Sequence, residues 1–118
     1  DIFQRIFLGS VFRRCRPGFL RADSGRCMEL DGYCEDLQLA FEYNGEQHYN
    51  PHHFFHRRCR DKFNSAWTRD RLKASMCAAV AVRLVVVPFS VQDKWSFIRI
   101  SLLQWFDIAT IFPAQVAE

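Results

Sequence analysis

The chain has 118 residues, of which 49% are hydrophobic and 15% aromatic, and its formal net charge is +3. This composition excludes an intrinsically disordered chain and predicts one domain with a packed core, residues 1–118. No apolar run approaches the length of about 18 residues that a membrane-spanning helix needs, so no membrane partner is predicted. The chain begins without an initiator Met, and we expect it to be an excerpt or a mature product of a longer protein.

The charges are distributed unevenly along the chain. Residues 1–28 carry a net charge of +4, residues 29–56 carry six acidic groups and no Lys or Arg, and residues 57–118 carry a net charge of +5. Thirteen of the sixteen basic residues are Arg, whose planar guanidinium suits a phosphate group. An acidic stretch between Arg-rich flanks favours a phosphodiester backbone as the partner, and a solvated basic surface is the alternative.

The five cysteines show no C-x-x-C spacing, and their odd number leaves one over in any disulfide scheme. This pattern predicts reduced thiols and an intracellular location. A zinc site that combines some of the cysteines with His52, His53 or His56 is an alternative, although the spacing does not support it.

In chain order, the first predicted element is an amphipathic helix. Apolar residues recur at helical spacing from Ile2 to Val11, so the helix begins near Asp1. Residues 13–26 hold five Arg together with Pro17 and two glycines, which predicts a basic loop.

Two strands follow, at residues 28–33 and 37–43. The second alternates apolar with polar or small residues, and the Asn44-Gly45 pair after it predicts a tight turn. Glu42 then points away from the apolar face of its strand, while Asp31 lies at the end of the preceding strand or in the loop after it. If the strands are neighbours, these two carboxylates converge at one end of the sheet and can hold Mg²⁺ or Mn²⁺.

The C-terminal half predicts a helix, a strand and a second helix. The first helix runs over residues 62–79 with Asp61 as its N-cap, and directs Ala74 and Cys77 or Ala78 inward together with Phe63 and Ala66 or Trp67. Asp70 and Lys73 lie one turn apart in it, as in an ion pair within the helix. Residues 82–87 are mostly β-branched and predict a strand buried on both faces of a central sheet.

The last helix follows a capping pattern at Ser90 and Asp93. Its apolar positions recur at helical spacing, at Val91, Trp95, Ile98, Leu102 and Trp105 or Phe106.

At the acidic stretch the sequence resembles the PD-(D/E)xK, or restriction-endonuclease-like, nuclease superfamily. Residues 39–49, LAFEYNGEQHY, are similar to a branch with the motif E-Y-x-G-x-Q-H-Y and, more loosely, to the very-short-patch repair endonucleases. Asp31 matches the first acid of the superfamily motif and Glu42 the second, whereas Asn44 stands where the motif has Lys. Three further segments match in order within residues 16–89, namely Arg16 to Leu20, Arg69 to Lys73 and Leu84 to Phe89.

The resemblance implies an α/β fold with an α-β-β-β-α-β core, in which a small mixed sheet is flanked by helices. It implies a metal-dependent endonuclease that hydrolyses phosphodiester bonds, in DNA rather than RNA. Asp31, Glu42 and the backbone carbonyl of Tyr43 would be the ligands of Mg²⁺ or Mn²⁺. Gln47 would position the attacking water, and His48 would act as general base in place of the motif Lys.

Glu29 and Glu35 are secondary candidates in the acidic stretch. The candidate nucleic-acid-binding residues come from the basic flanks and are Arg14, Arg16, Arg57, Arg58, Arg60, Arg69 and Lys73. Asn44 in place of Lys, and Ala66 and Trp67 where the branch has Gln, leave an alternative open. In that alternative the nuclease fold binds RNA or DNA without cleavage, for example as a subunit of a ribonucleoprotein assembly.

Overall fold

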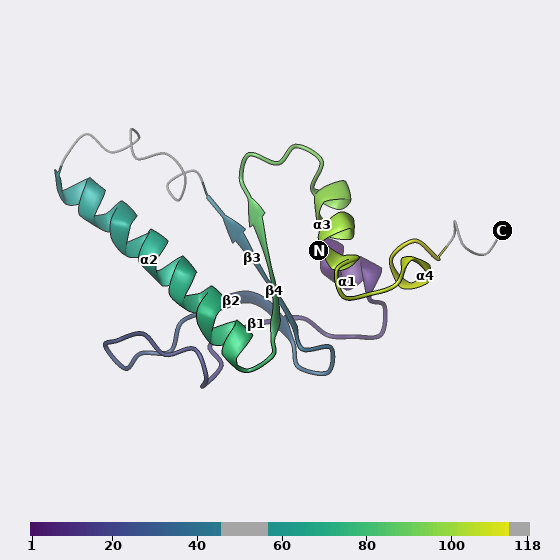
Figure 1. Ribbon diagram of the computed structural model, residues 1–118, viewed down its shortest axis with the longest axis horizontal. Coiled ribbons are helices and arrows are strands. Elements are labelled where there is room, and N and C mark those ends of the chain that lie inside the picture. Colours follow the sequence, from purple (N-terminus) through teal and green to yellow (C-terminus); the bar gives the residue numbers. More distant parts are fainter. Residues whose placement is uncertain (46–56, 114–118) are drawn as a thin grey trace.

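The computed structural model describes the backbone of residues 1–45 and 57–113 and the side chains of residues 1–45 and 68–113 (Figure 1). The elements along the described chain are α1 (Ile2–Ile6), β1 (Arg13–Cys15), β2 (Leu30–Cys34), β3 (Leu39–Asn44), α2 (Arg57–Ala79), β4 (Arg83–Pro88), α3 (Lys94–Leu102) and α4 (Ile108–Ile111). The protein is therefore of the mixed α/β class, as predicted.

The four strands form one small mixed sheet in the order β1-β2-β3-β4. β1 pairs with β2 and β2 with β3 in antiparallel fashion, whereas β3 and β4 are parallel. The prediction that residues 82–87 form a central strand buried on both faces is wrong, because β4 is the edge strand of this sheet and Leu84 and Val86 are only partly buried.

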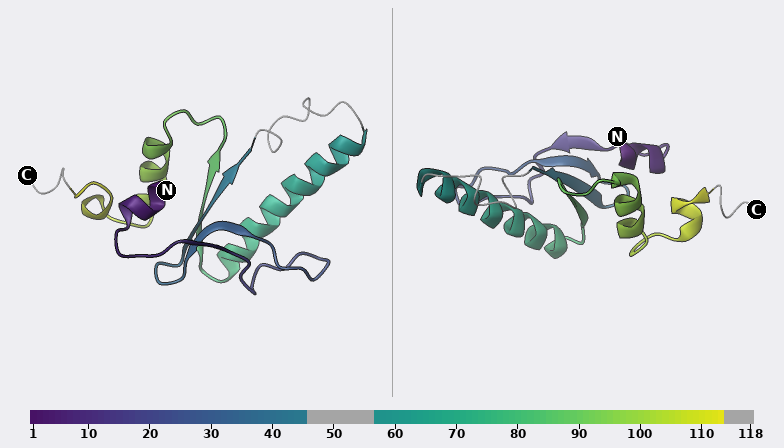
Figure 2. Two further views of the ribbon diagram at one scale, coloured as in Figure 1. Left: turned by 180° about the vertical axis from the view of Figure 1, so that it is seen from behind. Right: turned by 90° about the horizontal axis from the view of Figure 1, so that it is seen from above.

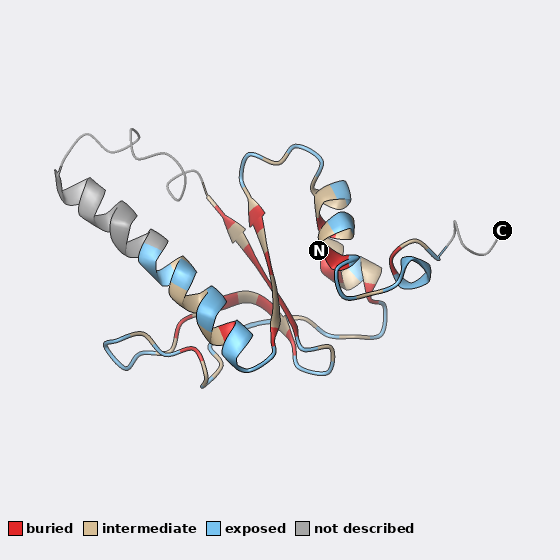
Figure 3. Cartoon of the chain, in the orientation of Figure 1, coloured by how far each residue is buried: buried red, intermediate tan, exposed pale blue. Residues whose placement is uncertain are grey.

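Helices lie on both sides of the sheet, and each side has its own core (Figures 2 and 3). On one side, which we call the aromatic side, α1, α3 and α4 pack against the strands. Its buried residues are Phe3, Phe7, Leu39, Phe41, Val85, Val87, Ile98, Leu102 and Ile111. On the other side, which we call the cleft side, α2 packs through its C-terminal half. The smaller core there consists of Leu20, Met28, Leu30, Ala40, Cys77 and Val82.

A loop prediction and a turn prediction are wrong because pairing within the sheet overrides local sequence preference. Residues 13–15 lie in the segment predicted as a basic loop, but they form β1 because they pair with β2. The turn predicted at Asn44-Gly45 is also wrong, since Asn44 is the last residue of β3 and pairs with Pro88 of β4. The tight turn between β2 and β3 lies at residues 35–38, where Gln38 takes a φ of 49°.

The N-terminal helix is shorter than predicted. Asp1 caps it by accepting a hydrogen bond of 2.8 Å from the Phe3 amide, but the helix ends at Ile6 and Val11 is 56% exposed. The apolar residues after Ile6 therefore do not all continue one helical face.

α2 starts at Arg57, so Asp61 lies inside the helix and is not its N-cap. Arg and Lys have good helix propensity, and no Gly or Pro interrupts residues 57–61. Of the predicted inward residues, Cys77 is fully buried, but Ala74 and Ala78 are exposed.

Helix α3 is capped by Asp93 rather than by Ser90. The Ser96 amide donates to Asp93 Oδ1 at 3.1 Å, one turn later than the predicted capping pattern. Ile98 and Leu102 are buried as predicted, but α3 is shorter than the predicted helix, since Val91 precedes it and Trp105 and Phe106 follow it. No helix in the described part of the chain is both long and apolar enough to cross a bilayer.

Candidate functional site

The candidate site begins with the alternation of side chains along β3. Leu39 and Phe41 point into the core of the aromatic side, while Glu42 and Asn44 point to the cleft side. Both polar residues are nonetheless well covered, with 9% of Glu42 and 8% of Asn44 exposed. The predicted direction of Glu42 is therefore confirmed, and β3 places a buried carboxylate on a surface that α2 and residues 16–31 also line.

Asp31 reaches the same site from β2, but not from the predicted position. It is the second residue of β2, near the start of the strand rather than at its end. Because β2 and β3 are antiparallel and Gly32 pairs with Phe41, continuing the register by one pair places Asp31 opposite Glu42. A residue at the far end of β2 would lie opposite the start of β3.

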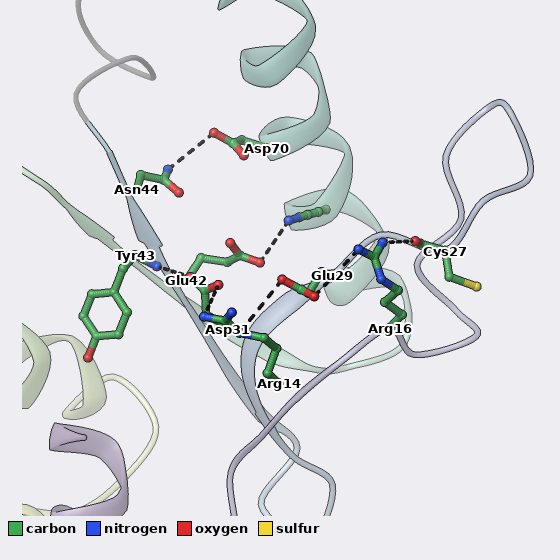
Figure 4. A network of polar contacts seen from close by, with 10 residues as sticks. Arg14, Arg16, Cys27, Glu29, Asp31, Glu42, Tyr43, Asn44 and Asp70 are labelled. Carbon is green, nitrogen blue, oxygen red and sulfur yellow. Dashed lines mark hydrogen bonds and ion pairs between the residues drawn. The ribbon is translucent and has the colours of Figure 1, made fainter.

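The Asp31 carboxylate also holds the backbone of β3. Its Oδ2 atom accepts a hydrogen bond of 2.8 Å from the Tyr43 amide. The Tyr43 ring points away from the acidic residues (Figure 4). Its hydroxyl donates to Asp1 at 2.8 Å on the other side of the sheet. Tyr43 thus contributes only its backbone to the site, as the predicted ligand role requires, while its carbonyl as a metal ligand stays a prediction.

Lys73 forms an ion pair with Glu42. Its ammonium donates to Glu42 Oε1 at 3.0 Å from α2, and only 15% of the Lys73 side chain and 11% of the Glu42 side chain are exposed. The sequence prediction placed Lys73 among the nucleic-acid-binding residues and next to Asp70. The ion pair that the structure shows for it instead crosses from helix to sheet.

Burial and charge act in opposite directions on Glu42. Removal from water raises the pKa of the Glu42 carboxyl above its usual value, and the nearby Asp31 and Asp70 charges raise it further. The hydrogen bond and positive charge of Lys73 lower this pKa but do not cancel the rise. The ionised form of Glu42 is therefore only partly compensated, and a bound cation would stabilise it.

Burial also raises the pKa of a thiol near Glu42. The pKa of the Cys77 thiol is raised to about 11, first by burial and then by the Glu42 charge.

Asn44, which stands at the position of the motif Lys, donates from Nδ2 to Asp70 Oδ2 at 3.4 Å (Figure 4). α2 therefore contributes both a cation, Lys73, and an acid, Asp70, to the site.

The basic segment around β1 lies against the acids. Arg14 Nη2 is 3.9 Å from Asp31 Oδ1, and Arg14 Nε is 3.9 Å from Glu29 Oε1. Arg16 Nη2 is 3.7 Å from Glu29 Oε2, and Arg16 Nη1 donates to the Cys27 carbonyl at 3.0 Å. Two of the predicted nucleic-acid-binding arginines thus stand at the acidic site, with mostly exposed side chains.

A cleft of about 740 Å³ lies between α2 and residues 16–31, and it is lined by Asp31, Glu42 and Lys73 but not by Arg14. Its charged lining residues are equally divided between base and acid and consist of Arg16, Arg26, Arg69, Lys73, Glu29, Asp31, Glu42 and Asp70. Within the described part of the chain, no group of three or more His, Cys, Asp or Glu side chains is arranged to hold a metal ion. The structure therefore offers a carboxylate pair, Asp31 and Glu42, rather than a complete ligand cage.

The other predicted site residues lie partly in the cleft, partly away from it and partly outside the described residues. Glu29 lines the cleft, but Glu35 is exposed in the β2–β3 turn and its prediction as a site residue is wrong. Arg69 lines the cleft. Gln47, His48 and the three histidines at 52, 53 and 56 lie outside the described residues, as do the side chains of Arg57, Arg58 and Arg60. Of the five cysteines, the four whose side chains are described are free thiols.

Sequence reasoning missed Asp70 and Arg26 as cleft residues and misjudged the partner of Lys73. One signal for Lys73 was present: it lies four residues before Cys77, which was predicted to face inward. A basic residue on the inward stripe of a helix needs a buried anion, and Glu42 was the acid predicted on the strand face opposite Phe41.

Comparison with known proteins finds relatives in viruses. The chain is 35% identical over 92 residues to uncharacterized protein 094L of Frog virus 3 (isolate Goorha), 39% over 93 residues to uncharacterized protein 033L of Invertebrate iridescent virus 3, and 40% over 90 residues to uncharacterized protein 307L of Invertebrate iridescent virus 6. The matches cover 77%, 75% and 70% of this chain, but 59%, 47% and 44% of the respective relatives. The chain thus spans roughly half the length of these relatives, and their names state no activity.

No protein-family model matches the chain, and no solved structure matches it either.

Proposed function

We propose that this chain is a metal-dependent nuclease of the restriction-endonuclease-like fold that hydrolyses phosphodiester bonds, in DNA rather than RNA. One observation carries the proposal: Asp31 and Glu42, from different strands, line one cleft, and Lys73 places its ammonium 3.0 Å from Glu42. The order of elements from α1 to β4 agrees with the core that the sequence resemblance implies. Arginines at the cleft mouth favour a polyanionic substrate.

The donor atoms of the carboxylate pair suit a hard divalent cation. Asp31 Oδ2 is engaged by the Tyr43 amide and Glu42 Oε1 by Lys73, which leaves Asp31 Oδ1 and Glu42 Oε2 as the carboxylate oxygens for Mg²⁺ or Mn²⁺. The raised pKa of Glu42 agrees with a site that is short of positive charge. When bound, the cation supplies Lewis-acid polarisation of the scissile phosphate and lowers the pKa of a water molecule.

The residues of the chain would supply the rest. Lys73 orients Glu42 through its hydrogen bond and brings a positive charge to the place where charge develops on the phosphate oxygens. It thereby takes the place of the motif Lys, whose position Asn44 occupies. Arg16 and Arg69 at the cleft bind flanking phosphates as charged donors. Gln47 and His48 stay candidates for positioning and deprotonating the attacking water.

The test is a cleavage assay on purified protein with Mg²⁺ or Mn²⁺ and end-labelled DNA and RNA. We expect cleavage that is abolished by chelation and lost to background in Asp31→Asn and Glu42→Gln. Asp36→Asn, which changes an exposed acid in the β2–β3 turn, should keep wild-type activity. Cleavage by the two site variants at the wild-type rate would refute the proposal.

A second function is favoured by the charge balance of the cleft. Arg14, Arg16 and Lys73 already pair with Asp31, Glu29 and Glu42, so the acids are compensated in part without a metal. Such a cleft would serve a domain that binds RNA or DNA without cutting it. In that case the protein should bind an oligonucleotide, show no cleavage with either metal, and keep the same affinity when the metal is removed.

A further inference from the structure

The pairing of β1 with β2 is irregular beside Asp31. Arg13 pairs with Tyr33, but Cys15 pairs with Leu30, so two steps along β1 correspond to three along β2. Asp31 and Gly32 therefore lie opposite the single residue Arg14. Bulges of this kind change the direction of side chains next to functional sites, and here the bulge sets Arg14 against Asp31.

The two oxygens of Asp31 have different partners. Oδ2 accepts the hydrogen bond of 2.8 Å from the Tyr43 amide, whereas Oδ1 lies 3.9 Å from Arg14 Nη2. The oxygen left for a cation is thus the one that Arg14 faces (Figure 4). Arg14 and a divalent cation would compete for the same atom.

The two basic contacts of the carboxylate pair also differ in strength. The Lys73 ammonium lies 3.0 Å from Glu42, and both side chains are at least 85% covered by protein, with 15% and 11% exposed. The Arg14 side chain is 69% exposed and its contact with Asp31 is 3.9 Å long. An exposed ion pair of this length contributes little to stability, so a divalent cation can replace it at small cost.

We propose that Arg14 is an exchangeable partner of Asp31: a divalent cation displaces its guanidinium from Oδ1, and the released guanidinium binds a phosphate of the polynucleotide. Glu29, 3.9 Å from Arg14 Nε, keeps the guanidinium beside the cleft during the exchange. Binding of the cation and binding of the nucleic acid then strengthen each other. The cation releases Arg14 for the phosphate, and the phosphate keeps Arg14 away from Asp31 Oδ1. This inference rests on the proposed cation site at Asp31 and Glu42.

Two measurements test the exchange without relying on cleavage. The first is binding of Mn²⁺ to the protein alone, followed by electron paramagnetic resonance. Arg14→Gln should bind Mn²⁺ about two- to fivefold more tightly than the wild type, because a competing cation has been removed. The control is Arg13→Gln, which changes the exposed neighbour whose side chain leaves β1 on the opposite side, and it should bind as the wild type does.

The second measurement is the affinity for a fluorescent single-stranded oligonucleotide at constant ionic strength, with and without Ca²⁺. We expect Ca²⁺ to tighten binding about tenfold in the wild type and in Arg13→Gln. The increase should fall to less than about twofold in Arg14→Gln, since the released guanidinium is missing.

If Arg14→Gln and Arg13→Gln behave alike in both measurements, the exchange is refuted. The proposed nuclease function still stands in that case, provided that the wild type binds the metal and cleaves. A wild type whose oligonucleotide affinity does not respond to Ca²⁺ would overturn the exchange as well. A wild type that neither binds Mn²⁺ nor cleaves would refute the proposed function itself, so the two failures can be told apart.

Discussion

Strand β3 contributes to both sides of the sheet, but its side chains have different roles on the two sides. On the aromatic side, Phe41 stacks on Phe3 with ring centroids 4.3 Å apart, inside a core built from three helices. On the cleft side, the next residue, Glu42, is almost as well buried but carries a carboxyl whose pKa burial raises. Of two neighbouring residues of β3, Phe41 thus belongs to a hydrophobic core and Glu42 to the candidate site, and substitutions of the two should change stability in opposite directions.

The largest effect on stability should come from removing an aromatic ring from the core of the aromatic side. Phe41→Ala removes a ring that is 5% exposed and lies over Gly32, where even an added Cβ would come within 2.1 Å of it. We expect the free energy of unfolding to fall by about 3–5 kcal/mol in urea titrations. Leu8→Ala, which truncates a side chain that is 84% exposed, should stay within about 0.5 kcal/mol of the wild type. A loss below 1 kcal/mol in Phe41→Ala would contradict this division of roles.

The next effect should come from removing the cation of the cleft side. Lys73→Met leaves the buried Glu42 carboxylate without its partner and should cost about 2 kcal/mol at neutral pH. Without Lys73 the pKa of Glu42 rises further, so the folded state takes up a proton more readily than the unfolded state. The loss should therefore shrink as the pH falls toward the ordinary value of 4.5 and Glu42 becomes neutral.

Lys73→Arg is the control for this prediction, because it keeps a positive charge beside Glu42. It should recover most of the stability at neutral pH. A loss in Lys73→Met that is the same at acidic and neutral pH would show that packing of the Lys73 stem, rather than its charge, is responsible.

A smaller effect of the opposite sign is expected at Glu42 itself. Because the pKa of Glu42 is raised, folding shifts the balance from its ionised toward its protonated form, and Glu42→Gln resembles the protonated form. Thermal unfolding near pH 7 should show a stability equal to that of the wild type or up to about 1 kcal/mol higher, while the proposed cleavage is expected to be lost. The gain should disappear in acid, where the wild type is protonated as well. A clear destabilisation at neutral pH would mean that the Lys73 contact outweighs burial.

The smallest effect is expected at the helix cap of the aromatic side. The Ser96 side chain and amide hold the pKa of Asp93 below its usual value of 3.8. Because this pKa is depressed, the cap stabilises the fold above the ordinary value and loses its effect as the pH falls through the lowered pKa. Asp93→Ala should lower the melting temperature slightly at neutral pH and not at all in strong acid. Asp93→Asn should keep most of the capping.

Local patterns predicted the direction of side chains better than the limits of elements. The alternation in β3 placed Glu42 opposite Phe41, and helical spacing identified Ile98 and Leu102, because both periods follow from backbone geometry alone. Asp93 shows the limit of local rules, since the capping pattern was recognised but assigned to a residue one turn too early.

What could not be predicted depends on contacts between distant segments. The residues of β1 show no strand pattern, and they are extended because β2 binds them. The partner of Lys73 is set by how α2 crosses the sheet, which no local spacing specifies. The bulge opposite Arg14 arises from a register shift between two strands that the intervening loop joins, and a sequence motif contains no such information.

The bond between Lys73 and Glu42 joins residues that are 31 positions apart. During synthesis on the ribosome, both acids of the candidate site emerge before α2 does, and the ammonium arrives only when that helix settles on the sheet. A nascent fragment that ends before α2 would hold the acids without their cation. Under the proposed function, hydrolysis begins only after α2 has docked on the sheet. Cleavage by a nascent chain would then show that folding of the cleft side is complete.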